Sequence, residues 1–423
     1  MSQASSSTPS SVLPASPPGS SEWRPTPPTA KARVIRDDAE ALEVAAELAK
    51  VFAAQAGERD RHRLLPYAEV EAYSQSGLWG ITIPKAYGGA QVSQATVAKV
   101  FALLAAGDAS TAQIAQNSFE ILEVIRQTGS EAQQREVFGL VLDGYRLGNA
   151  FSEANGKDVE AYETRIVDQG NGQHQVNGRK FYSTGALFAH IVPIVALNEE
   201  GKVTVALADR YAPGLTVVDD WSAFGQRTTA SGSVLIDQVS VPASRVLPAH
   251  EVYDNPSAIG PQSQLIHAAI DAGIARGILQ ATVEFVREQA RPWIDSKADK
   301  ASDDVFTISA VGDLFIRLHA AEALLERAGR QLDATLAQVD LNSIALAKIA
   351  VAEAKVLTTE VALAAANKLF ELGGTRSTLQ KHNLDRLWRD ARTHTLHDPV
   401  RWKPFAVGQF YLNGVHPPLH SWI

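Results

Sequence analysis

The stretch Gly178-Arg-Lys-Phe-Tyr-Ser-Thr-Gly185 lies near the middle of a chain of 423 residues. Around it, residues 147–247 contain short runs of β-branched and aromatic residues that are interrupted by Gly, Asn and Asp. The dipeptides Asn171-Gly172 and Asn177-Gly178 are typical of tight turns between strands. The region therefore predicts a β domain of about 100 residues, folded as a sandwich or a barrel.

The chain on both sides of this β domain has helical periodicity. Residues 31–146 have apolar residues three and four positions apart and predict an N-terminal α-helical domain, with one helix over 110–129. Residues 248–401 predict a C-terminal four-helix bundle, with long Ala- and Leu-rich helices over 259–291, 307–336, 342–372 and 379–395. Residues 402–423 are expected to be an aromatic, loop-like tail that packs on the bundle or on a neighbouring subunit. The fold class is therefore α+β.

The first 30 residues differ in composition from the rest of the chain. Residues 1–30 are rich in Ser and Pro and contain few large aliphatic side chains. Such a segment buries too little apolar surface to offset the entropy of ordering it, so we expect a disordered tail. It lacks the basic and apolar stretches of a secretory signal, and the chain has no apolar run that is long enough to cross a membrane. These features predict a cytoplasmic protein.

The overall composition excludes several classes of function. Lys and Arg number 39 and Asp and Glu number 47, which gives a formal net charge of −8 and argues against nucleic acid as a partner. The chain contains no cysteine, which excludes disulfides, thiolate metal ligands and thiol nucleophiles. Redox chemistry in this chain would therefore need a bound cofactor.

Five motifs follow one another along the chain. They are Asn149-Ala-Phe-Ser-Glu153, the Gly178–Gly185 stretch, Ala230-Ser231-Gly232-Ser233 with Val241-Pro242, Leu372-Gly-Gly-Thr-Arg376 and Leu387-Trp-Arg-Asp-Ala-Arg392. Together with the order of helices, β domain and helical bundle, they resemble the acyl-CoA dehydrogenase superfamily over residues 36–405. The resemblance implies the fold of that superfamily and a bound flavin.

The resemblance also implies which residues bind the flavin. A flavin ring needs an apolar wall and hydrogen bonds to its polar edge. Phe151 and Tyr182 can supply the wall, and Ser152 and Thr184 can supply hydroxyl groups. The glycines of the fourth motif let the backbone approach the flavin of a neighbouring subunit, and guanidinium groups suit a phosphate. This second group consists of Arg291, Gly373, Gly374, Thr375 and Arg376.

A dehydrogenase of this superfamily needs a carboxylate base, normally Glu, and both positions that the resemblance implies for it lack Glu. After the fifth motif the chain reads His397-Asp398-Pro399-Val400, and the position on the first bundle helix is His267. Asp398 is one methylene shorter than Glu, and a displacement of about 1 Å can lower a rate by on the order of 10²-fold. A flavin dehydrogenase or oxidase with Asp398 or His267 as its base is the alternative function.

The segment Ala391-Arg-Thr-His-Thr-Leu-His-Asp-Pro399 instead resembles the flavin-dependent monooxygenases of this superfamily, a branch with dibenzothiophene monooxygenase and sulfur-acquisition oxidoreductases. The resemblance implies a two-component enzyme of sulfur metabolism. A separate NAD(P)H:flavin reductase supplies reduced FMN, with FAD as the alternative cofactor. A C4a-hydroperoxyflavin then oxygenates an organosulfur or similar small compound. The resemblance further implies a homo-oligomer, usually a homotetramer.

This chemistry needs groups that hold and protonate a peroxide in a dry pocket. His titrates near neutral pH and can donate a proton, so His397 is the first catalytic candidate, followed by the hydroxyl of Ser183 and the amide of Asn149. His394 lies three residues before His397, on the same face if the segment is helical. The His-x-x-His spacing also suits a metal ion, but the segment has no third ligand and we expect no metal site. A flavin-fold binding protein without enzymatic activity is the third interpretation.

Overall fold

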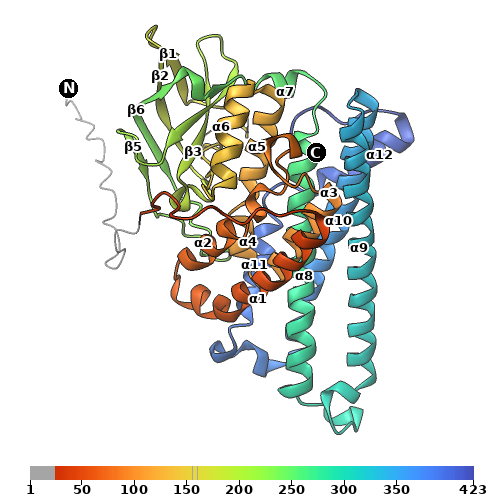
Figure 1. Ribbon diagram of the computed structural model, residues 1–423. Helices are drawn as coiled ribbons and strands as arrows, with labels where there is room; N and C mark the ends of the chain where they lie inside the picture. The colour runs from red at the N-terminus through yellow and green to blue at the C-terminus, as the bar shows by residue number, and fades with distance from the viewer. Residues whose placement is uncertain (1–23, 155, 160) are drawn as a thin grey trace, which may run out of the picture.

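The computed structural model describes residues 24–154, 156–159 and 161–423 (Figure 1). Residues 1–23, most of the expected disordered tail, lie outside the described residues. The rest of that tail lies against the β region. The carbonyl of Thr26 is 2.8 Å from Nε2 of His190, and the guanidinium of Arg24 lies 5.4 Å from the centre of the Tyr211 ring. Two of residues 24–30 thus contact the β region, and the disorder of the tail stays a prediction.

The N-terminal region is helical, as expected. Its α-helices are α1 (Asp38–His62), α2 (Tyr67–Gln75), α3 (Gln94–Gly107), α4 (Ala109–Gln113), α5 (Gln116–Thr128) and α6 (Glu131–Leu142). The side chains of Asp37 and Ser130 cap the first and the last of them. The expected single helix over 110–129 is divided into α4 and α5. The chain turns at Ile114, whose carbonyl lies against Gly185 of the β region, so tertiary packing sets this boundary.

The β region of the described chain is one mixed sheet of seven strands. The strands are β1 (Arg165–Asp168), β2 (Gln173–Lys180), β3 (Ile191–Leu197), β4 (Val203–Asp209), β5 (Leu215–Val217), β6 (Val234–Pro242) and β7 (Val246–Leu247). Their order is β5-β6-β2-β1-β3-β4-β7, and only the β1–β3 pair is parallel. The register of β2 against β6 shifts at Gly178, where a Cβ atom would lie 2.3 Å from Oγ1 of Thr164, so glycine is required there.

Three long helices that pack on one another dominate the C-terminal region. The α-helices of this region are α7 (Glu251–Asp254), α8 (Ile259–Glu288), α9 (Val305–Ala337), α10 (Leu341–Gly373), α11 (Asp385–His394) and α12 (Trp402–Asn413). The fourth bundle helix, α11, begins later than expected because residues 380–382 form a 3-10 turn. The expected loop-like tail contains α12, which packs on α10. Tertiary contacts outweigh the weak helix propensity of its aromatic residues.

The N-terminal and C-terminal helices form one helical body, and the sheet packs beside its upper end (Figure 1). Helices α3 and α8 approach each other closely: a Cβ atom on Gly273 of α8 would lie 2.3 Å from the carbonyl oxygen of Ala102. A continuous apolar core joins both sets of helices. Within the described residues, no helix has the length and apolar character that crossing a membrane requires.

Candidate functional site

A cavity of about 1030 Å³ lies where the sheet meets α5, α8, α11 and the end of the chain. Its lining residues fall in the segments 113–124, 149–159, 182–184, 195–205, 221–231, 249–267, 393–397 and 420–422, together with Tyr162. Segments from all three regions of the fold therefore converge on one site. A volume of this size can hold a ligand as large as a cofactor together with a small molecule.

The sheet side of the cavity carries four expected flavin-binding residues, Phe151, Ser152, Tyr182 and Thr184. Asn149, also on the wall, connects their two segments. Its Oδ1 accepts a hydrogen bond from the backbone N of Phe151 at 3.0 Å, and its Nδ2 donates to the carbonyl of Tyr182 at 3.4 Å. Tyr182 has a φ of 59°, a conformation that non-glycine residues adopt rarely. The wall thus offers aromatic surface together with fixed amide and hydroxyl groups.

An ion pair holds the first motif against strand β2. Nζ of Lys180 lies 2.7 Å from Oε1 of Glu153 and donates to the carbonyl of Phe151 at 2.9 Å. Burial lowers the pKa of Lys180 to about 8, although Glu153 opposes this shift. Because the two charged groups satisfy each other, they position the motif and offer no free charge to a ligand.

Another wall carries three imidazole rings: His267 from α8, His394 from the end of α11, and His397 from the segment that follows. The rings of His267 and His397 are stacked with their centroids 3.7 Å apart. Nδ1 of His267 lies 3.4 Å from Nε2 of His394. These three residues form the histidine cluster. No group of three or more side chains in the described residues is arranged to hold a metal ion.

Asp271 fixes the histidine cluster from inside the protein. It lies one helical turn after His267 on α8 and is fully buried. Its Oδ1 lies 2.6 Å from Nδ1 of His394, and its Oδ2 accepts from Nζ of Lys355 at 2.8 Å and from Oγ1 of Thr359 at 2.7 Å. Burial alone would raise the pKa of Asp271, but Lys355 and His394 hold it at about 2. The carboxyl group is therefore ionised.

This ionised carboxylate determines where the protons of two rings lie. Asp271 accepts a hydrogen bond from Nδ1 of His394, which leaves Nε2 of that ring as an acceptor. Burial lowers the pKa of His394, although Asp271 opposes this, and burial with the neighbouring histidines lowers the pKa of His267 well below 6.5. Both rings are thus neutral at pH 7. His267 then donates from Nδ1, and its buried Nε2 keeps a lone pair that no other part of the described chain contacts by a hydrogen bond.

His397 has a different environment. Its side chain is 31% exposed, whereas that of His394 is 0% exposed. Its Nδ1 lies 3.6 Å from Oδ1 of Asp398, whose Oδ2 is 3.1 Å from Nζ of Lys403. Burial alone would raise the pKa of Asp398, but His397 and the ammonium groups of Lys355 and Lys403 hold it well below its usual range. His397 is therefore the accessible ring of the cluster, with an anion beside it.

Ser183 does not lie where a catalytic hydroxyl group was expected. It is buried, and it is not among the described residues that line the cavity, whereas Tyr182 and Thr184 are. The role of Ser183 as the second proton donor stays a prediction.

The expected phosphate-binding group lies outside the cavity. Arg291 is exposed after the end of α8, and Nη1 of Arg376 donates to the carbonyl of Gln289 at 2.7 Å. The group consists of these two arginines, Gly373, Gly374 and Thr375. In the part of the chain that the structure describes, no member of this group lines the cavity. Within one subunit these residues are separate from the site, and their contact with a neighbouring flavin stays a prediction.

Sequence reasoning missed several residues of the site. Asp271 could have been found, because it follows His267 by four residues, a spacing that places two side chains on one face of a helix. Trp221 and Glu120 also line the cavity, and neither belongs to a motif that the sequence singled out, whereas Trp422 comes from the expected aromatic tail. The position of Trp422 also shows that the C-terminal segment covers the cavity of its own subunit.

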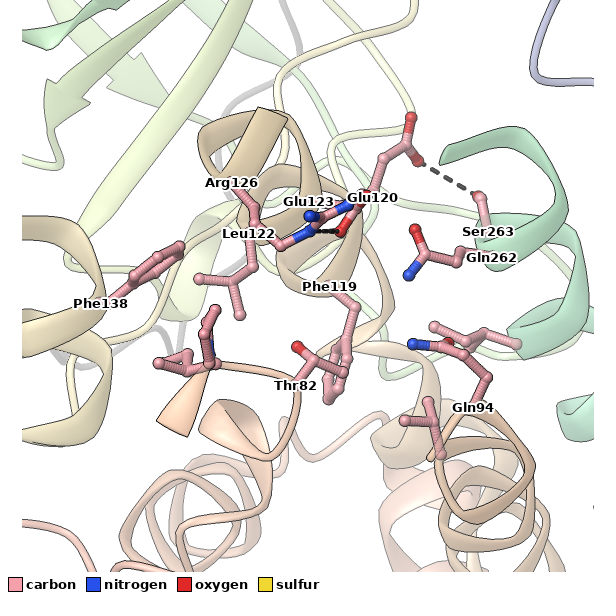
Figure 2. A pocket seen from close by; sticks show the side chains of 14 residues that line it. Thr82, Gln94, Phe119, Glu120, Leu122, Glu123, Arg126, Phe138, Gln262 and Ser263 are labelled. Atoms are coloured by element: carbon pink, nitrogen blue, oxygen red, sulfur yellow. Dashed lines mark hydrogen bonds and ion pairs between the residues drawn. The ribbon is translucent and has the colours of Figure 1, made fainter. Parts of the chain in front are cut away.

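A second pocket of about 20 Å³ between α3, α5 and α8 has room for a single water molecule. Glu123 and Arg126 form an ion pair beside it, with Nη2 of the arginine 2.5 Å from the carboxylate. Figure 2 shows that Glu120 points away from this pocket toward Ser263, whose Oγ lies 3.2 Å from Oε2 of Glu120. The small pocket is too small for a substrate, and the Glu120 carboxyl group belongs to the wall of the large cavity.

Three family matches follow one another along the chain. The N-terminal domain of acyl-CoA dehydrogenase matches residues 36–144, the middle domain matches 150–239, and the C-terminal domain matches 265–402. Their order is that of the N-terminal helices, the sheet and the C-terminal helices.

Individual proteins are similar over most of the chain. Dibenzothiophene monooxygenase of Rhodococcus erythropolis is 32% identical over 399 residues, which cover 90% of this chain and 95% of that protein. The probable FMNH2-dependent monooxygenase SfnC of Pseudomonas putida is 31% identical over 388 residues, which cover 89% and 96%. Among solved structures, the FMN-bound TdsC from Paenibacillus sp. A11-2 has a TM-score of 0.86 and 30% identity, covering 90% of this chain and 100% of that one.

Proposed function

Because the chain belongs to the acyl-CoA dehydrogenase family, in its flavin-dependent monooxygenase branch, we propose that it uses reduced FMN and O2 to oxygenate an organosulfur or similar small compound. The chain is a flavin-dependent oxidoreductase, and FMN is its cofactor, as the names of two relatives indicate. The observation that carries the proposal is the histidine cluster. It occupies the cavity wall where a dehydrogenase would need a Glu base.

The residues of the cavity fit a flavin. Phe151, Tyr182 and Trp221 provide aromatic surface, with the last two rings 6.1 Å apart, and Thr184 provides a hydroxyl group that is fixed by a 2.7 Å contact with Ser231. The volume of about 1030 Å³ also leaves room for a substrate. When bound, reduced FMN supplies the two electrons that activate O2, so that one oxygen atom enters the substrate and the other leaves as water.

His397 is the proton donor in this proposal. Its Nδ1 faces Asp398, which leaves Nε2 for the cavity. A proton on Nε2 can neutralise negative charge that develops on oxygen. The half-buried position keeps the ring in contact with both the cavity and the buried ion pair.

His267 and His394 form the accepting side of the site. Nε2 of His267 can take up a proton that is released in the cavity, while its Nδ1 passes a proton to Nε2 of His394. The imidazolium that results lies 2.6 Å from the carboxylate of Asp271. This relay moves positive charge from the reacting atoms to a buried anion.

Of the two candidate bases of the alternative dehydrogenase function, Asp398 is the weaker candidate. Asp398 is not among the described residues that line the cavity, and Lys403 pairs with it. A carboxylate whose pKa is held far below its usual range is a weak base. His267 lines the cavity, and its buried Nε2 has no hydrogen-bond partner in the described chain, so it remains the candidate base of that alternative.

The proposal includes partners. Arg291 and Arg376 lie outside the cavity of their own subunit. Their position supports a homo-oligomer, specifically a homotetramer, in which a neighbouring subunit supplies the phosphate-binding group. The use of FMNH2, as in the name of one relative, requires a separate NAD(P)H:flavin reductase. A soluble reductase and a cysteine-free chain suit the reducing cytoplasm, where we place the protein.

Isotope labelling tests the proposed function. The protein is incubated with FMN, NADH, a flavin reductase and a panel of sulfides and thiophenes under ¹⁸O2, and the products are analysed by mass spectrometry. We expect a product with one labelled oxygen atom that requires all components, and a rate that falls roughly 10²-fold in His397→Gln. The alternative function would hold instead if no labelled product formed and acyl-CoA bleached the bound flavin under argon.

A further inference from the structure

The cavity wall is uneven in charge. No lysine or arginine lines it anywhere in the described chain, whereas the carboxyl groups of Glu120, Glu153 and Asp158 do. Glu153 is neutralised by Lys180, and Asp158 is exposed on the segment before β1. Glu120 is thus a carboxyl group of the cavity with which no cation of the described residues forms an ion pair.

The neighbours of Glu120 leave its carboxyl group free to accept further hydrogen bonds. Nε2 of Gln116 donates to Oγ of Ser263 at 3.1 Å, so the hydroxyl hydrogen of Ser263 is available for Oε2 of Glu120, 3.2 Å away. A carboxylate accepts about four hydrogen bonds, and Ser263 supplies the single one that the described residues give. The remaining lone pairs need donors from a bound molecule.

Two other residues of the wall also have polar atoms that can accept a hydrogen bond from a bound molecule. Nε2 of His267 carries a lone pair, and Oε1 of Gln113 is a buried acceptor, and within the described chain neither has a hydrogen-bond partner. Ser263 and His267 lie on consecutive turns of α8. One small molecule can therefore contact Glu120 while another of its atoms faces the histidine cluster.

From these observations we infer that the substrate carries no negative charge and donates a hydrogen bond from an N–H or O–H group to Glu120. The inference rests on the proposed function and names the substrate class of the same cavity. An organosulfur anion, such as a sulfinate or a sulfonate, would face the carboxylate of Glu120 without a lysine or arginine of the described residues on the wall. A compound without a donor would leave the buried acceptors unpaired, which costs affinity.

The preference for a donor should depend on pH. Burial raises the pKa of Glu120 to about 7. Facing it, Ser263 and the neutral ring of His267 come from α8, and on its own helix Arg126 is already paired with Glu123. The carboxylate fraction therefore rises between about pH 6 and pH 8, and the affinity for a hydrogen-bond donor rises with it.

Two bicyclic probes of matched shape test the inference. Indole has an N–H group where benzothiophene has sulfur, and benzenesulfinate provides an anion. Their binding to the protein loaded with oxidised FMN, which does not turn over, is measured by isothermal titration calorimetry. At pH 8 we expect indole to bind at least about tenfold more tightly than benzothiophene, as a charge-assisted hydrogen bond predicts, and benzenesulfinate to bind more weakly than either.

Glu120→Gln keeps the shape of the side chain and removes its charge. In this variant the preference for indole should fall below about threefold and lose its pH dependence, with benzothiophene affinity nearly unchanged. Glu284→Gln, at an exposed position of α8 outside the cavity lining of the described chain, is the control and should keep the preference.

Equal binding of indole and benzothiophene by the unsubstituted protein, or tighter binding of benzenesulfinate, would overturn the inference. A preference for indole that survives Glu120→Gln would also overturn it. These binding results do not depend on turnover. If the preference is present and the ¹⁸O2 experiment yields no product, the proposed function fails and the donor site stands.

Discussion

Two carboxyl groups, Asp271 behind the histidine cluster and Glu120 on the cavity wall, have opposite protonation behaviour. Asp271, at the histidine end, has Lys355, Thr359 and His394 as partners and a pKa of about 2. Glu120, at the α5 end, has the hydroxyl of Ser263 and a pKa of about 7. Burial alone would raise both values. The difference shows that partners within the chain decide which carboxyl group is structural and which is left for a ligand.

The largest expected effect is a loss of stability when the carboxylate of Asp271, beside the histidine cluster, is removed. Asp271→Asn removes the anion that neutralises Lys355, whose side chain is 0% exposed. Breaking a buried pair by removal of one partner typically costs about 3–5 kcal/mol, so we expect a loss of that order in the free energy of unfolding at pH 7. Denaturant titration measures it. The double variant Asp271→Asn/Lys355→Met should regain part of the loss, and a change below about 1 kcal/mol would contradict the role given to Asp271.

The second expected effect is on the rate of oxygen transfer, through the proposed proton relay from His267 to His394. His267→Phe keeps a planar ring for stacking against His397 and removes the Nε2 lone pair. We expect oxygen transfer under saturating reduced FMN to slow by roughly 10²-fold, while the dissociation constant for oxidised FMN changes less than about twofold. Stopped-flow turnover and flavin fluorescence measure the two quantities. His319→Phe, at an exposed position of α9, is the control and should leave both unchanged.

A third experiment compares the two carboxyl groups through stability. Folding raises the pKa of Glu120 from 4.5 to about 7, so the folded state binds more protons and its stability falls as pH rises through this interval. Glu120→Gln should therefore be more stable than the unsubstituted protein at pH 8, by about 1–2 kcal/mol, and equally stable near pH 4. For Asp271 the sign is reversed, because its lowered pKa adds stability above pH 4 that is lost as pH falls toward 2. Thermal unfolding across this pH range tests both.

The smallest expected effect concerns an exposed carboxyl group of the same cavity. Asp158 lines the cavity as Glu120 does, but its side chain is exposed and water screens its charge. Asp158→Asn should change the affinity for indole by less than about twofold. A larger change in the same calorimetric titration would mean that the electrostatic field of the whole cavity, not the contact position of Glu120 beside Ser263, sets the preference.

The long-range organisation of the fold was predictable, since it follows from composition and periodicity. The predicted start of the first bundle helix at residue 259 agrees with α8, and the α+β fold and the family are confirmed. The break between α4 and α5 and the existence of α12 were not predictable. Both depend on contacts with distant segments, such as that between Ile114 and Gly185, which no local pattern records.

The site was predictable where a motif carries it. Phe151, Tyr182, Thr184 and His397 lie on the cavity wall, and their roles stay predictions until measured. Glu120 was not predictable, because a Glu on a helix is usually solvated, and only the packing of α5 against α8 brings Ser263 to it. Lone side chains that become important through burial leave no pattern in a single sequence.

Helix α8 carries both the Ser263 contact of Glu120 and the His267 ring, and its close packing on α3 at Gly273 prevents it from sliding. The two positions are one turn apart, about 6 Å along the axis. In the proposed site, the repeat of α8 thus sets the distance between the hydroxyl group that contacts Glu120 of α5 and the ring of His267. During divergence within the family, moving that hydroxyl group along α8 would change this distance by whole turns, whereas a change in the size of side chains could only trim the space between.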